Sequence, residues 1–290
     1  MTDRRRIDLH THSTASDGTV SPADLMCDAA AAGLDVVAIT DHDTTGAWAE
    51  AAAALPAGLT LVRGAELSCS LHHPGGPSIG LHLLAYLFDP AHPGLRARRE
   101  GVRGARRRRA ERMLQLLREA GHEISMDDVE RVAGNAPVGR PHVADALVNR
   151  GIVADRATAM GPDWVGHGGR YWAPKDESDV LDTIAEVRAA GGVPVLAHLR
   201  RPSSRGPADD AAIAAMAAAG LAGLEVEHAD HSADDRVHLR GLAAELGLLT
   251  TGSSDFHGTR KPVALGEHLT DPAAYEAIAA QGRGCPLLTG

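Results

Sequence analysis

Long apolar runs, cysteines and aromatic residues are all scarce in this chain of 290 residues. No apolar run reaches the roughly 18 residues that a membrane-spanning helix requires, so we predict that the protein has no membrane segment. The opening residues, MTDRRRIDLH, lack the apolar core of a signal peptide and favour a cytoplasmic protein. The three cysteines, Cys27, Cys69 and Cys285, are odd in number and widely spaced, which argues against a disulfide framework.

Lysine is almost absent as well. Only Lys175 and Lys261 occur, so arginine carries nearly all the positive charge. The net charge of −9 disfavours a protein that binds nucleic acid through charge alone. The same balance suits a chain that collects divalent cations, because their ligands are carboxylates and neutral imidazoles, and 16 histidines are present. A hydrophobic content of 44% is typical of a globular protein with a sizeable core.

Apolar runs and helical patterns alternate along most of the chain. The residue patterns predict seven strands, at 7–10, 35–43, 59–69, 81–88, 193–199, 221–228 and 248–258. Strands that alternate with helices predict right-handed crossovers and a parallel sheet. Seven such strands favour an α/β fold with a closed or nearly closed barrel over an open sheet.

Residues 91–176 interrupt this alternation. Three helices are predicted there, in GVRGARRRRAERMLQLLREAGHEI, MDDVERVAG and GRPHVADALVNRG, and we expect the aromatic residues Trp164, Tyr171 and Trp172 to form their core. We therefore predict a barrel domain made of residues 1–90 and 177–290. A helical insertion at 91–176 forms a second, cap domain.

Each predicted strand carries a metal-type ligand, which we place at or near its C-terminal end. These residues are His10, His12, His42, Glu66, His82, His198, Glu227, His228, His231, Asp255 and His257. In an α/β barrel, active sites are built at the face where the strands end. One histidine at a strand end is usually a satisfied polar residue, but burial of so many titratable groups without cations would cost desolvation and repulsion. The set therefore predicts a metal site.

These segments also resemble a known family. IDLHTHSTASDGT, AITDHDTTGAW, GAELSC, VLAHLRRP, GLEVEHADH and GSSDFHG resemble the successive motifs of the polymerase and histidinol phosphatase (PHP) family, in family order across nearly the whole chain. Within the family they are similar to the small bacterial phosphoesterases that act on nucleotides and RNA ends. The resemblance implies a distorted, TIM-like (β/α)7 barrel and two to three divalent metal ions.

The resemblance assigns nine ligands to three ions. The sets are His10, His12 and Asp255; Glu66, as a bridge, with His82 and His198; and Asp17, His42 and His257. Imidazole and carboxylate ligands without thiolate suit Mn, Fe or Zn, and the share of oxygen favours Mn. Asp41 and Asp43 are expected to hydrogen-bond the ligating imidazoles. Leu199 stands where relatives usually have proline, which should alter the loop more than the ligand.

The expected chemistry is hydrolysis by a metal-bound hydroxide, because no serine, threonine or cysteine nucleophile is evident. Arg140 and His142 resemble substrate-contacting positions of the subgroup, and Arg200 is a further candidate for binding phosphate. His228 and His231 are candidates to line the pocket and to protonate the leaving group.

Several functions remain open at this point. The first is a phosphoesterase acting on a 3',5'-nucleoside bisphosphate, or a 5'-3' exonuclease on short RNA. The second is a histidinol-phosphatase-like phosphomonoesterase. The third is a metal-dependent C–N amidohydrolase, against which Glu66 at the bridging position and the scarcity of lysine argue. The fourth is a metal-binding module without activity, which normally lacks some ligands. No obligatory protein partner is predicted.

Overall fold

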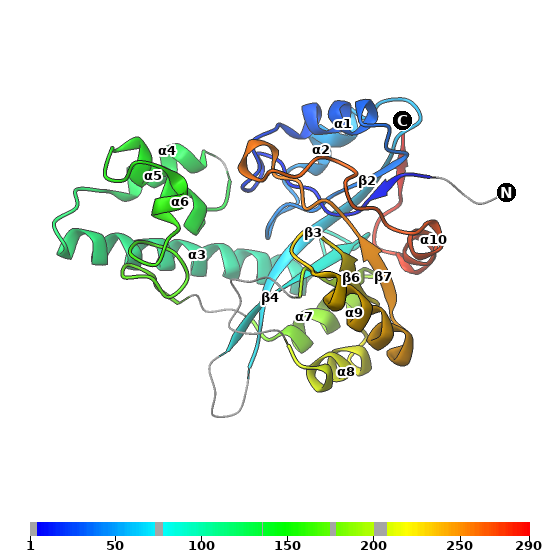
Figure 1. Cartoon of the computed structure of the whole chain (residues 1–290). Coiled ribbons are helices and arrows are strands. Elements are labelled where there is room, and N and C mark those ends of the chain that lie inside the picture. The colour runs from blue at the N-terminus through cyan, green and yellow to red at the C-terminus, as the bar shows by residue number, and fades with distance from the viewer. Residues whose placement is uncertain (1–4, 73–77, 135, 175–177, 200–207) are drawn as a thin grey trace. The chain divides into compact units, whose positions relative to one another are not determined.

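The computed structural model describes residues 5–72, 78–134, 136–174, 178–199 and 208–290. They form two compact units, one made of Met1–Arg99 with Ser178–Gly290 and the other of Glu100–Glu177. The first unit contains the sheet and the second is helical (Figure 1). Among the described residues, no helix has the length and apolar character needed to cross a membrane.

The sheet of the first unit runs in chain order from β1 to β7. Its strands are β1 (Ile7–Asp8), β2 (Val36–Ile39), β3 (Thr60–Leu71), β4 (Ile79–Tyr86), β5 (Val193–Leu196), β6 (Gly223–Glu227) and β7 (Leu249–Gly252). The two ends of the sheet approach each other beyond β1 and β7, where Thr11 pairs with Phe256 and the backbone N–H of His12 donates to Phe256 at 2.8 Å. The predicted α/β barrel with seven main strands is therefore confirmed, and it is nearly closed.

The direction of β4 differs from the prediction. β4 pairs antiparallel with both β3 and β5, so the expectation of a wholly parallel sheet is wrong here. The connection from Leu71 to Ile79 is too short for a crossover helix, which parallel neighbours require. Because β4 runs in the opposite direction, its N-terminal half lies at the edge where the other strands end. His82 therefore reaches that edge from the start of its strand, opposite Ser68, and not from the C-terminal end as predicted.

Six helices accompany these strands in the residues that the structure describes. They are α1 (Pro22–Ala31), α2 (Trp48–Ala53), α7 (Val180–Ala189), α8 (Asp210–Ala218), α9 (Ala233–Leu246) and α10 (Pro272–Gln281). Ser21 caps α1 by accepting the backbone N–H of Asp24, and Pro22 follows at the first helical position. Helix α7 contacts β3, β4 and β5, whereas α9 contacts β6 and β7. Helix α10 and the short strand β8 (Leu288–Thr289), which pairs with β3, lie beyond the predicted elements.

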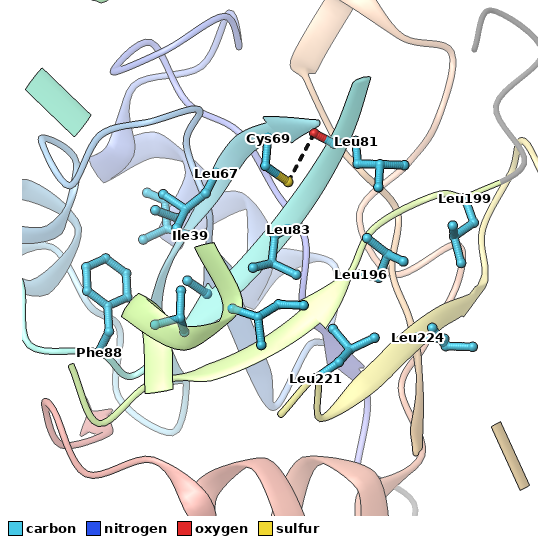
Figure 2. Packing of buried hydrophobic residues seen from close by; sticks show 14 of the residues in the cluster. Ile39, Leu67, Cys69, Leu81, Leu83, Phe88, Leu196, Leu199, Leu221 and Leu224 are labelled. Carbon is cyan, nitrogen blue, oxygen red and sulfur yellow. Dashed lines mark hydrogen bonds between the residues drawn. The ribbon is translucent and has the colours of Figure 1, made fainter. Parts of the chain in front are cut away.

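The main hydrophobic core lies between the sheet and its helices. Figure 2 shows one leucine from each of four neighbouring strands in this core: Leu67, Leu83, Leu196 and Leu224. The thiol of Cys69 is buried and donates to the carbonyl of Leu81 at 3.6 Å. Full burial of a leucine side chain contributes about 1.5–3 kcal/mol, so this core fixes the strands that position the polar edge.

The second unit has its own core. Its helices are α3 (Pro93–Glu119), which begins in the first unit, α4 (Met126–Ala133), α5 (Arg140–Asn149) and α6 (Arg156–Ala159). A capping box lies at the start of α4, where the side chains of Ser125 and Asp128 accept each other's backbone N–H groups. Tyr171 is buried in this core, and Trp164 and Trp172 pack against it, as predicted from the sequence.

Candidate metal centre

The carboxylate of Glu66 lies at the centre of a buried cluster of imidazoles in the first unit. Glu66 is 1% exposed, and five imidazole nitrogens from four different segments surround its two oxygens. The distances to Oε2 are 3.1 Å from His10 Nε2, 3.0 Å from His12 Nε2 and 3.1 Å from His42 Nδ1; those to Oε1 are 2.5 Å from His82 Nδ1 and 2.9 Å from His198 Nε2.

Within the described part of the chain, three overlapping groups of side chains have donor atoms within 4.8 Å of one another. The groups are His10, His12, Glu66 and Asp255; His42, Glu66 and His82; and His12, Asp17, His42 and His257. Glu66 is shared by the first two groups, which suits a bridging carboxylate. His198 lies outside these groups but contacts Glu66. Its neighbour Leu199 is buried in the main core (Figure 2).

The local geometry at His10 and His12 follows from the end of β1. One residue, Thr11, separates the histidines, so both rings point to the same side of the extended chain. Their Nε2 atoms are 2.9 Å apart. Two nitrogens bound to one cation at about 2.1 Å, at right angles to each other, lie about 3 Å apart. The pair therefore has the spacing of two ligands to a single ion.

Glu225 orients His10 and was missed by the sequence reasoning. Its buried carboxylate lies 3.0 Å from His10 Nδ1, accepts the backbone N–H of His198 at 2.7 Å and accepts the hydroxyl of Ser253. The proton on Nδ1 leaves Nε2 as the lone-pair nitrogen that faces the cluster. The available signal was an acid within the apolar strand GLEVEH. The sequence singles out Glu227 as the metal-type ligand of this strand, but Glu227 pairs with Arg240.

The prediction that Asp41 hydrogen-bonds a ligating imidazole is corrected by the structure. Asp41 accepts the backbone N–H of Ser13 at 2.9 Å and the hydroxyls of Ser13 and Ser16 at 2.8 and 2.6 Å. It reaches an imidazole only through Ser16, whose hydroxyl is 3.4 Å from His12 Nδ1. Asp43 likewise accepts the backbone N–H and hydroxyl of Ser68, both at 2.8 Å. These bonds fix the backbone around the ligands.

The imidazoles and the carboxylates of the cluster shift each other's pKa values. Burial lowers the pKa of His12, but hydrogen bonds to Asp255 and Glu66 raise it to about 9. Burial likewise opposes the charged form of His10, yet Asp255, Glu66 and Glu225 hold its pKa well above its usual value. Burial would raise the pKa of Glu66, but the surrounding imidazoles, His42 first, hold it well below its usual range. Without a cation, the carboxylates therefore hold protons on neighbouring rings.

Unpartnered nitrogens show that the cluster fits cations. The Nδ1 atoms of His42 and His82 are buried and have no hydrogen-bond partner, although each faces a Glu66 oxygen. Buried polar atoms are nearly always satisfied, so exceptions require an explanation. A lone pair that faces a carboxylate oxygen is repelled unless a positive charge lies between them. The donor set of imidazoles and carboxylates is that of divalent transition-metal ions.

The predicted proton donors lie beside the cluster. His228 Nε2 is 3.3 Å from Asp255 Oδ2. His231 donates from Nδ1 to the carbonyl of Val226 at 2.9 Å, which leaves a lone pair on Nε2. Burial lowers the pKa of His231, so this ring is neutral near pH 7. Proton donation by His228 or His231 stays a prediction.

The predicted substrate-binding residues lie elsewhere in the chain. Arg140 and His142 belong to α5 of the second unit, where His142 Nδ1 accepts the backbone N–H of Gly139 at 3.1 Å. Arg200 lies outside the described residues. The roles assigned to these three side chains stay predictions.

The first unit is a nearly closed barrel in which histidines and acids surround one glutamate. This combination is typical of metal-dependent enzymes. The model of the PHP domain family matches residues 8–190. The chain belongs to this family, as its motifs indicated.

Individual relatives cover almost the whole chain. A 5'-3' exoribonuclease of Haemophilus influenzae is 32% identical over 91% of this chain and 94% of its own. A 3',5'-nucleoside bisphosphate phosphatase of Chromobacterium violaceum is 35% identical over 87% of each chain. Among solved structures, a protein of Bifidobacterium adolescentis assigned as a metal-dependent phosphoesterase is 37% identical over 98% of each chain, with a TM-score of 0.87. An amidohydrolase from Chromobacterium violaceum, solved with sulfate and no metal, is 31% identical over 95% of this chain and 96% of its own, with a TM-score of 0.82.

Proposed function

We propose that this protein is a metal-dependent phosphoesterase that hydrolyses phosphate esters of nucleotides. The substrates are 3',5'-nucleoside bisphosphates, 5' ends of short RNA, or both. One observation carries the proposal: five imidazoles converge on the buried carboxylate of Glu66 at one edge of the barrel. The names of the relatives from Haemophilus influenzae and Chromobacterium violaceum support the substrate class.

The cluster holds two or three divalent ions in this proposal, with Mn preferred. The ligands are His10, His12, Asp17, His42, Glu66, His82, His198, Asp255 and His257. Bound cations of this kind lower the pKa of water to near neutrality and neutralise the charge of phosphate oxygens.

The residues around the ligands control which ring nitrogens face the metal cluster. Glu225 holds a proton on His10 Nδ1 and keeps Nε2 directed into the cluster. His257 Nδ1 donates to the backbone carbonyl of Asp255 at 2.8 Å, which directs its Nε2 towards Asp17. Ser253 donates its hydroxyl to Glu225. Burial would raise the pKa of this carboxyl, but His10 and His228 hold it well below its usual range, so it is too weak a base to activate Ser253 as a nucleophile. The attacking group is accordingly water. Arg140, His142 and Arg200 are the proposed phosphate-binding side chains.

A panel of substrates with one matched pair of variants tests the proposal. The Mn-loaded protein is assayed with a 3',5'-bisphosphonucleotide, a 5'-phosphorylated oligoribonucleotide, histidinol phosphate and a cyclic amide. We expect turnover of the first or second substrate and its loss by at least 100-fold in Glu66→Gln, since the bridging charge disappears. Glu227→Gln is the matched control, because Glu227 is also a strand glutamate but pairs with Arg240. Equal activity of Glu66→Gln and the control would contradict the proposal.

The panel also separates the alternatives. One similar structure is named an amidohydrolase, so hydrolysis of the cyclic amide alone would favour C–N chemistry. Such sites usually contain a carboxylated lysine at the bridging position. Here Glu66 occupies that position, and Lys261 contacts Asp255. In ¹⁸O-labelled water, the label is expected in the released phosphate; label in the alcohol would contradict attack at phosphorus.

A further inference from the structure

The two oxygens of Asp255 have different surroundings. Oδ1 faces the ligand side of the cluster, 3.4 Å from both His10 Nε2 and His12 Nε2. Oδ2 contacts His228 Nε2 at 3.3 Å and forms an ion pair with the ammonium group of Lys261. Only one oxygen of this carboxylate is therefore free to bind a cation.

His228 contacts Asp255 as a hydrogen-bond donor. The backbone N–H of Asp230 donates to His228 Nδ1 at 3.0 Å, so the ring hydrogen lies on Nε2, which faces Asp255. Arg236 donates to the backbone carbonyl of His228 at 2.8 Å and fixes this turn after β6. The ring is 2% exposed. His228 is therefore held in the tautomer that binds a carboxylate.

Lys261 approaches Asp255 from a fixed loop. The preceding turn η1 (Gly258–Arg260) is held by the backbone N–H of Thr259, which donates to Thr19 at 3.0 Å, and by Arg260, which donates to the backbone carbonyl of Asp17 at 2.7 Å. Asp255 itself has a φ of 52°, in the left-handed region that non-glycine residues seldom adopt. Its backbone conformation thus depends on surrounding contacts.

The residue type at position 261 supports a specific role. Of the 29 lysines and arginines in the chain, only Lys175 and Lys261 are lysines. An ammonium group is a compact point charge that can sit on one oxygen, whereas a guanidinium group favours binding both oxygens of a carboxylate. Arginine at this position would compete for Oδ1.

The geometry points to a clamp in which Lys261 and His228 hold Oδ2 of Asp255 and leave Oδ1 alone for the cation. Both are positioning residues that act through Asp255, and the inference rests on the proposed metal site. The clamp keeps Asp255 monodentate, which preserves an open coordination position for water or phosphate. Without it, the carboxylate turns and binds through both oxygens or through neither.

The test measures cation binding, not only activity. Mn²⁺ affinity of the full-length protein is measured by titration with detection of free Mn²⁺, and Co²⁺ is added separately to record its visible spectrum, which reports coordination number. We expect Lys261→Met to weaken Mn²⁺ binding by about 10- to 100-fold, the usual effect of losing a group that orients a ligand. The Co²⁺ spectrum should change as well. Lys261→Arg keeps the charge and should retain more affinity than Lys261→Met but alter the spectrum.

Controls separate the clamp from general effects of charge and folding. Arg240→Met removes an exposed positive charge that pairs with Glu227 and should leave affinity and spectrum unchanged. His228→Phe removes the second donor and tests the clamp independently if Lys261→Met does not fold. Unchanged or tighter Mn²⁺ binding in Lys261→Met or in His228→Phe, with an unaltered Co²⁺ spectrum, would overturn the clamp alone. Failure of the wild-type protein to bind Mn²⁺ would overturn the proposed function and the clamp with it.

Discussion

Both units of this protein bury apolar side chains, but among the described residues the first unit also buries a cluster of acids and histidines. The first unit places Glu66, His10 and Asp255 in its interior, each 2% exposed or less. The second unit buries Leu147, Val143 and similar apolar residues, and its described part contains no group of metal-type ligands. Burial of charge is unfavourable without a counter-charge, whereas burial of apolar surface is favourable by itself. The stability of the first unit therefore depends on bound protons or cations, whereas that of the second unit does not.

The largest expected effect concerns the apolar core. Leu147→Ala truncates a fully buried side chain in the second unit and should lower the free energy of unfolding by about 2–5 kcal/mol. Mn²⁺ affinity should not change, because the cluster lies in the first unit. Urea unfolding and Mn²⁺ titration measure the two quantities. Val237→Ala, at a position 67% exposed, is the control and should change neither.

The next largest effect is a loss of stability with rising pH, which we expect in the first unit only. In metal-free protein, the pKa of His12 is raised from 6.5 to about 9, so its contribution to stability is complete below pH 6.5 and is lost as the pH rises through 9. The loss is on the order of 1–3 kcal/mol, since one pKa unit corresponds to about 1.4 kcal/mol. The carboxylates in the cluster have lowered pKa values, as for Glu66, and stay ionised throughout this window.

Urea unfolding at pH 7 and pH 9, with chelator or with Mn²⁺, measures this difference. With Mn²⁺ the decline should disappear, because the cation replaces the proton and binds more tightly as the pH rises. An equal decline in both conditions would contradict the exchange of protons for cations.

A smaller effect is expected from the orientation of His10. Glu225→Gln removes the charge that holds the proton on Nδ1 and should weaken Mn²⁺ binding by about 10-fold or more. Glu227→Gln, two residues further along β6, is the matched control. Equal Mn²⁺ affinities of the two variants would show that Glu225 has no role in orienting His10.

The smallest effect lies at a helix end in the second unit. Ser125→Ala removes the capping box of α4 and should cost about 1 kcal/mol of unfolding free energy. Ser125→Asp retains a capping acceptor and should restore most of it. Thermal unfolding compares the two variants, and a similar loss in both would argue against capping as the cause.

Much of the fold and of the candidate site was predictable because local spacing encodes it. The pair His10 and His12 follows an apolar run, and period two places both rings on one side. Ser21 and Pro22 specify the start of α1 in the sequence itself. The three expected helices of the insertion correspond to α3, α4 and α5. In each case the signal lies within a few residues.

Features that depend on contacts between distant segments escaped prediction. The direction of β4 depends on its pairing with β3 and β5, and His82 reaches the cluster only because that strand is reversed. Glu225 and Glu227 look equivalent in GLEVEH, but a bulge between them gives one a buried position and the other an ion pair with Arg240. Lys261 shows no local motif, and its role depends on the position of Asp255.

The most direct test of the central claim is a crystal structure of Mn-loaded protein with anomalous scattering measured at the Mn edge. The account predicts at least two Mn peaks, one of them bound by His10, His12 and Asp255 and both contacting Glu66. A Mn-replete crystal without Mn density at Glu66 would contradict it.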